Sequence, residues 1–126
     1  MSARRFCMAA ALLLALATML GALGAHALKG RLPLDRLDVL QTAVYYQIFH
    51  ALGLLGLGLA LERAPSRALS VAAWLVLCGV LLFSGSLYLL LAGAPRLIGV
   101  LTPVGGVCLV AGWCAAAWAL RPVRSP

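Results

Sequence analysis

The sequence predicts an all-α protein, a polytopic membrane protein whose four transmembrane helices form an antiparallel bundle. Of its 126 residues 64% are hydrophobic and only 10% are charged, and the mean hydropathy is +1.06. These values lie far outside the range of soluble globular domains. The apolar residues form four runs that are long enough to cross a bilayer as helices, at about 6–28, 39–61, 67–92 and 97–120. We therefore expect residues 1–126 to form a single transmembrane domain.

The charged residues all lie in the termini or between the apolar runs, and their formal net charge is +7. Nucleic-acid binding would instead require basic residues on one solvated face with aromatic residues among them, so no nucleic-acid partner is expected. Six basic residues lie in the N terminus, the second loop and the C terminus, against four in the first and third loops. Since cytoplasmic segments carry the excess of basic residues, we expect both termini to be cytoplasmic.

The four cysteines all fall within apolar runs, at Cys7, Cys78, Cys108 and Cys114. None belongs to a C-x-x-C pair or has a histidine at zinc-site spacing, so they are interpreted as small packing residues. The sequence also contains no nucleotide-binding loop, no G-x-S-x-G and no pair of carboxylates within a run. No catalytic residue and no metal site is therefore predicted.

The first run resembles a secretory signal, with basic residues before it and Ala25-His26-Ala27 imitating a cleavage site. Its apolar part is longer than the 7 to 15 residues of a usual signal core, so we expect it to be retained as a helix. Ala17, Gly21 and Ala25 form a small-residue stripe that allows close helix packing. His26 should lie at the membrane interface.

The second run is expected to begin near residue 38 or 39, because Asp38 and Gln41 have the spacing of a helix-start capping box. Within it Tyr46, Gln47 and His50 are spaced so that they can share one helix face. His50 should lie about 13 to 18 Å into the bilayer, where a neutral imidazole would take partners from the same helix and from the third.

The third and fourth runs carry clear start and stop signals. Ser66 is a suitable N-cap for the third helix, and Gly93 followed by Pro95 should end it. Pro103 lies near the start of the fourth run, where it predicts either a kink or the true helix start.

The polar residues of the four runs all lie at the same predicted side of the membrane. They end the first and third runs and begin the second and fourth, which antiparallel helices bring to one leaflet. Polar side chains within a bilayer are costly unless partnered, so their gathering is a candidate binding site. Its members are His26, Tyr46, Gln47, His50, Ser84, Ser86, Tyr88 and Thr102. The glycines expected at helix-packing positions are Gly21, Gly24, Gly53, Gly85, Gly105, Gly106 and Gly112.

Four segments in order, GALGAHALKG, TAVYYQIFHALGLL, LLFSGSLYLL and LTPVGGVCLVAGW, resemble the successive motifs of the bacterial family known as domain of unknown function 423. Eukaryotic transmembrane protein 256 is similar in the same segments. The resemblance covers about residues 6–120 and implies a four-helix protein of the bacterial inner membrane, without an established activity. The matching residues are Gly24, His26, Gln47, His50, Ser84, Gly85, Ser86, Tyr88, Pro103, Gly105, Gly106 and Trp113.

Three functions are compatible with this pattern. The first is a non-enzymatic accessory subunit or a bundle that binds lipid or another small molecule, with the bilayer, another membrane protein or a second copy as partner. The second is redox chemistry, with His26 and His50 binding haem or the Tyr/Gln/His group binding a quinone; no particular cofactor is indicated. Haem is disfavoured because His50 should lie about 10 Å deeper than His26. The third is a small transporter or ion pathway, which is disfavoured because the opposite leaflet offers only cysteines as ionisable groups.

Overall fold

The computed structural model describes residues 1–121, and the part of the chain that it describes is helical, without strands. Four of its helices are long and apolar enough to span a membrane, which confirms the predicted fold class. The C-terminal residues 122–126, among them Arg124, lie outside the described range. The elements are α1 at Ala3–Ala22 with a π-helical turn at Leu23–Ala27, α2 at Leu34–Arg63, α3 at Arg67–Leu91, and α4 at Leu101–Ala119, which a 3-10 turn at Arg96–Val100 precedes.

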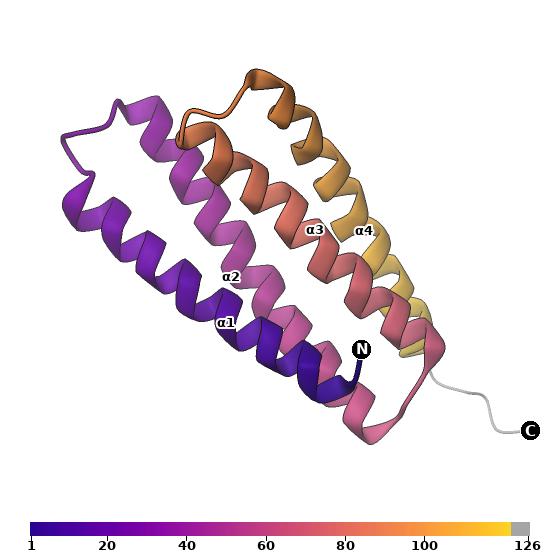
Figure 1. Cartoon of the computed structure of the whole chain (residues 1–126). Coiled ribbons are helices and arrows are strands. Elements are labelled where there is room, and N and C mark those ends of the chain that lie inside the picture. The colour runs from indigo at the N-terminus through magenta and orange to yellow at the C-terminus, as the bar shows by residue number, and fades with distance from the viewer. Residues whose placement is uncertain (122–126) are drawn as a thin grey trace, which may run out of the picture.

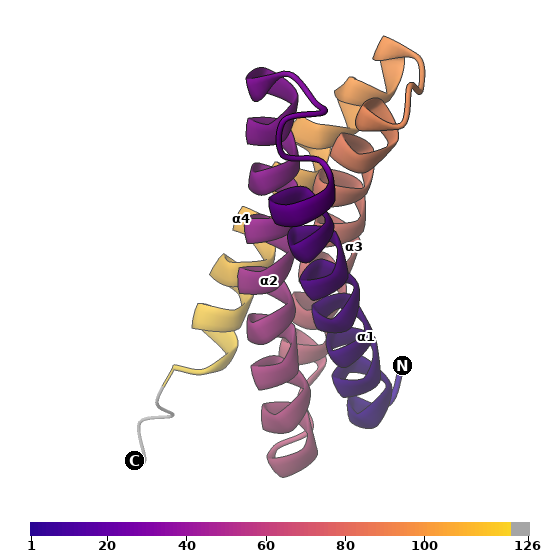
Figure 2. The ribbon, with the colours of Figure 1, turned by 90° about the vertical axis from the view of Figure 1, so that its left-hand side faces the viewer.

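The helices pack in the order in which they occur in the chain, α1 against α2, α2 against α3 and α3 against α4 (Figure 1). Successive helices are antiparallel, so the loops after α1 and after α3 lie at one end of the molecule. α1 and α4 occupy opposite edges, and contact between them is marginal. Figure 2 shows α4 crossing the other helices obliquely, with its C-terminal end directed away from α1.

Three of the predicted helix signals are confirmed. The Ser66 hydroxyl accepts a hydrogen bond of 3.4 Å from the Leu69 amide at the start of α3. Gly93 follows the end of α3 with a φ of 94°, a left-handed conformation that glycine adopts without strain. Pro103 is the third residue of α4, where its missing N–H leaves no intrahelical bond unmade, so it marks a helix start rather than a kink.

The predicted start of α2 was wrong, because the helix begins at Leu34, directly after Pro33. Asp38 is exposed inside the helix and does not cap it. Tertiary contacts stabilise the additional turn: Leu37 is buried, and the Arg36 guanidinium donates a hydrogen bond of 2.6 Å to the Leu91 carbonyl at the end of α3. That bond satisfies a carbonyl that the helix end leaves free.

Small residues bring the helices close together. A Cβ on Gly105 would collide with the backbone of Phe83, and one on Gly112 would lie 2.9 Å from Cγ2 of Val76, so α4 approaches α3 almost backbone to backbone. A side chain on Gly53 would overlap the Trp113 ring, and a Cβ on Gly24 would lie 2.8 Å from Cδ2 of Leu40. Gly21 and Gly106 make ordinary contacts.

Gly85 is the exception among the glycines expected at packing positions. A Cβ there would have no atom within 4 Å, so a side chain could be added without collision. The expectation that Gly85 mediates a close helix approach was therefore wrong.

Candidate functional site

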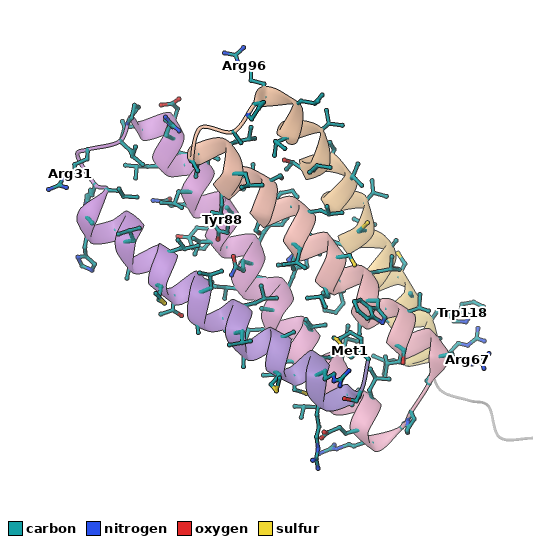
Figure 3. All side chains as sticks on the ribbon, viewed as in Figure 1. Met1, Arg31, Arg67, Tyr88, Arg96 and Trp118 are labelled. Atoms are coloured by element: carbon teal, nitrogen blue, oxygen red, sulfur yellow. The ribbon has the colours of Figure 1, made fainter. Side chains whose placement is uncertain are left out.

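The centre of the candidate site is Gln47, whose side chain is only 1% exposed. Its Nε2 donates a hydrogen bond of 2.7 Å to the backbone carbonyl of Leu13 in α1. Its Oε1 accepts a hydrogen bond of 2.8 Å from the hydroxyl of Tyr88 in α3. Tyr88 lies in the half of the molecule nearer the α1–α2 and α3–α4 loops (Figure 3). One amide side chain thus joins three helices.

Two serines of α3 extend these contacts to both neighbouring helices. The buried Ser84 hydroxyl donates a hydrogen bond of 2.8 Å to the carbonyl of Ala43 in α2. Ser86 donates to the carbonyl of Phe83 at 2.9 Å, and its oxygen lies 2.7 Å from the hydroxyl of Thr102 in α4. With only one hydroxyl proton on each, Thr102 must then donate to Ser86.

These five side chains, Gln47, Ser84, Ser86, Tyr88 and Thr102, are called the polar network below. Throughout residues 1–121, every buried side-chain nitrogen or oxygen has a hydrogen-bond partner. Polar groups that are satisfied in this way stabilise helix association in a bilayer, where an unmade bond has no water to replace it.

His50 and Tyr46 lie outside the polar network, on the flank of α2 that faces α3 and α4. The rings of Tyr46 and His50 stack with centroids 5.6 Å apart, Tyr46 stacks on Phe83 at 4.3 Å, and His50 is 6.1 Å from Trp113. His50 Nδ1 lies 2.7 Å from the Tyr46 carbonyl. Because a carbonyl only accepts, Nδ1 carries the proton.

Of the three α2 residues expected to share one helix face, Tyr46 and His50 do lie together with stacked rings, whereas Gln47 bonds to Leu13 and Tyr88. Within the described residues, no hydrogen bond joins the His50 side chain to Gln47 or to the hydroxyl groups of α3. Consecutive residues of a helix point about 100° apart, so Gln47 turns toward α1 while the Tyr46 ring packs on Phe83 of α3. We call Tyr46, His50, Phe83 and Trp113 the aromatic flank.

His26 is separate from both groups, because it is exposed in the π-helical turn that ends α1. Beside that turn, a cavity of about 160 Å³ between α1 and α2 is lined by residues including Gly21, Gly24, Leu40 and Tyr45. Its lining is mostly apolar. No three His, Cys, Asp or Glu side chains of residues 1–121 are grouped so that they could hold a metal ion.

Two kinds of residue in these contacts were not found from the sequence. The acceptors in α1 and α2 are the backbone carbonyls of Leu13 and Ala43, and no side chain marks such an acceptor. Phe83 was missed because a phenylalanine in an apolar run is normally a packing residue. Its place directly before Ser84 was the available signal, since adjacent residues share the same depth in the membrane.

Four apolar helices with a hydrogen-bonded network in one half of their interior define a small polytopic membrane protein. The sequence matches the family described as protein of unknown function (DUF423) over residues 20–106. The chain belongs to that family. The matched range contains all of the polar network and His26.

Relatives from distant bacteria are similar over most of their length. A UPF0382 membrane protein of Staphylococcus haemolyticus is 43% identical over 103 residues, which cover 79% of this chain and 84% of the relative. UPF0382 membrane protein YwdK of Bacillus subtilis is 40% identical, covering 78% and 80%. UPF0382 inner membrane protein YgdD of Escherichia coli K12 is 43% identical, covering 75% and 72%. No solved structure matches the chain.

Proposed function

We propose that this protein is a non-enzymatic protein of the bacterial inner membrane, a helical scaffold that binds lipid or serves as an accessory subunit. The observation that supports this function is the polar network, whose members are all hydrogen-bonded to other groups of the protein. Gln47 both donates and accepts, and Tyr88 and Ser84 donate to other helices. A catalytic site needs donors, acceptors or nucleophiles that are available to a substrate.

The outer helices support a binding role for the surface. α1 packs mainly on α2, and α4 packs mainly on α3, so each keeps a broad apolar face toward the bilayer. Met8, Leu12 and Met19 of α1 and Val107 and Val110 of α4 are all exposed. Such faces accept acyl chains or the helix of another membrane protein without any polar group being buried.

The orientation belongs to this proposal. The end of the molecule that holds the N terminus and the α2–α3 turn carries five described arginines and one glutamate, whereas the opposite end carries four basic and two acidic residues. The excess of basic residues supports placing the first end, and with it both termini, in the cytoplasm.

A second candidate function, binding of a quinol, is favoured by the aromatic flank. Protonation of His50 at Nδ1 leaves Nε2 as an acceptor, which suits a quinol hydroxyl. The Tyr46 ring is 42% exposed beside it. A flat aromatic head group would stack on these rings, as aromatic pairs prefer.

The experiment that tests both functions is purification from native membranes in a mild detergent, followed by an absorption spectrum and native mass analysis. The scaffold function predicts no visible absorption band, and masses increased only by phospholipid or by another protein. A stoichiometric chromophore would contradict it. A retained quinone that is lost in His50→Leu but kept in Gln47→Leu would favour the second candidate.

A further inference from the structure

A groove opens at the end of the molecule opposite the polar network, between the end of α2, the start of α3 and the end of α4. Its volume is about 470 Å³, and its apolar walls include Leu59 and Ala60 of α2 and Leu120 of α4, with Arg63 among the lining residues. Volumes of this size are typical of sites that hold a small molecule or part of a lipid. Gly56 also lines it, and a Cβ there would meet no atom within 4 Å. The groove therefore has apolar walls and a charged residue at the end of α2.

The charges around the groove are positive. Arg63 lines it, and Arg67 lines an adjoining hollow of about 500 Å³ that shares Ser66 with the groove. Within residues 1–121 the single ion pair joins Arg4 and Glu62 at 3.7 Å, so neither Arg63 nor Arg67 is neutralised by a described carboxylate.

The end of α4 places an interfacial aromatic residue at the same end. Trp118 is 63% exposed, and the Arg121 guanidinium lies 3.5 Å from the centroid of its ring. Figure 3 shows Arg67 and Trp118 together at one end, whereas Arg31 and Arg96 lie at the other. Tryptophan and arginine are characteristic of the level of the lipid head groups. Ala119 and Leu120, which lie between Trp118 and Arg121 in the chain, line the groove, so part of its wall lies near that level.

We propose that this groove binds one anionic phospholipid, with an acyl chain between α2 and α4 and the phosphate at Arg63 and Arg67. Charge complementarity identifies this occupant, because a zwitterionic phospholipid brings no net charge to the two arginines. An inorganic anion has no apolar part that could pack against the walls of the groove. The inference rests on the proposed function, because it names the lipid that the scaffold binds.

The test uses the full chain in vesicles with spin-labelled phosphatidylglycerol or spin-labelled phosphatidylcholine, and measures the motionally restricted fraction of each lipid by electron spin resonance. We expect phosphatidylglycerol to be preferred several-fold at low salt, because each arginine near the surface strengthens the binding of an anionic lipid. The preference should fall as the salt concentration rises.

The arginines are tested by the double variant Arg63→Gln/Arg67→Gln, in which the preference should fall to about one. Its matched control is Arg31→Gln/Arg96→Gln, which removes two exposed charges from the opposite end and should keep the preference. No preference in the parent protein, or equal losses in both double variants, would overturn the proposal.

The groove itself is tested by Gly56→Leu, which adds a side chain to its wall where a Cβ meets no atom within 4 Å, against Gly85→Leu, which adds the same side chain at another such position. Only Gly56→Leu should lower the restricted fraction of phosphatidylglycerol, and equal effects would also overturn the proposal. Failure of this proposal can be told apart from failure of the proposed function. A bound chromophore or quinone, which would contradict the scaffold function, would be detected in the absorption spectrum and the native mass whatever the lipid preference.

Discussion

The hydroxyl of Tyr88 in α3 donates a 2.8 Å hydrogen bond to Oε1 of Gln47 in α2, while Nε2 of the same amide donates to the Leu13 carbonyl in α1. One buried side chain therefore depends on the positions of two other helices. Since the amide is 1% exposed, no lipid head group or bulk water replaces either partner.

Gln47→Leu should lower the free energy of unfolding in detergent by about 1 to 3 kcal/mol, because it leaves the half-buried Tyr88 hydroxyl without its acceptor. Combined with Tyr88→Phe, the two effects should be non-additive by roughly 0.6 and at most about 1.7 kcal/mol, the range known for hydrogen bonds between membrane helices. Chemical or thermal unfolding of the four proteins of the cycle measures this coupling. Strict additivity would show that the bond contributes nothing.

His50→Leu should change the free energy of unfolding by only about 0.5 kcal/mol or less, because the ring bonds only to a carbonyl of its own helix. The sequence instead suggested that the imidazole takes partners from its own helix and from α3. The same unfolding measurement on the double variant His50→Leu/Gln47→Leu should now give additive effects. Coupling between them would contradict the separation of the aromatic flank from the polar network.

Gly105→Ala should destabilise the protein by about 1 to 3 kcal/mol, since the new methyl group meets the backbone of Phe83, which cannot move aside without shifting α3. Gly85→Ala is the matched control, because its methyl group meets open space. It should be neutral or slightly stabilising, as alanine favours the helix. Equal effects of the two substitutions on the thermal unfolding midpoint would argue against the close approach of α4 to α3.

Reporter fusions test the proposed orientation. A fusion at Ala64 in the α2–α3 turn and one after Pro126 should both report the cytoplasm, and a fusion at Gly30 in the α1–α2 loop should report the periplasm. Residues 122–126 lie outside the described range, so the expected location of the second fusion is inferred from the end of α4 at Ala119. A reversed pattern would show that the excess of arginines does not determine the orientation.

Most of the fold was predictable because hydrophobic run length and helix-end chemistry are local. Ser66, Gly93 and Pro103 act through their own backbone positions, and each has the expected effect. The start of α2 was not predictable in this way, since the turn before Asp38 is stabilised by a contact from Arg36 to the end of α3. A contact across 55 residues leaves no mark in the local sequence.

For the candidate site, the sequence predicted mainly the depth of its residues in the membrane. Sequence order places Gln47, His50, Ser84 and Tyr88 in one leaflet, but the rotation of each helix about its axis decides which of them meet. Packing sets that rotation: Gln47 is buried beside Ala43 and Ala51, which leaves Tyr46 exposed on the adjacent flank. Spacing along one helix therefore predicted that Tyr46 and His50 lie together but did not show that Gln47 bonds to α1 and α3.

Packing in chain order has a consequence for how the protein assembles. Each helix after the first packs against the helix that enters the membrane just before it, and the fold does not depend on an extensive contact between the first and the last helix. Contacts between neighbours in the chain have a low loop-closure cost and form quickly. The amide of Gln47 can meet the Leu13 carbonyl as soon as the first hairpin is inserted, but its second bond waits for Tyr88 to arrive with the third helix. Until then the amide oxygen of Gln47 lacks the Tyr88 hydroxyl as its donor, which favours prompt capture of α3 over release of the hairpin into the lipid.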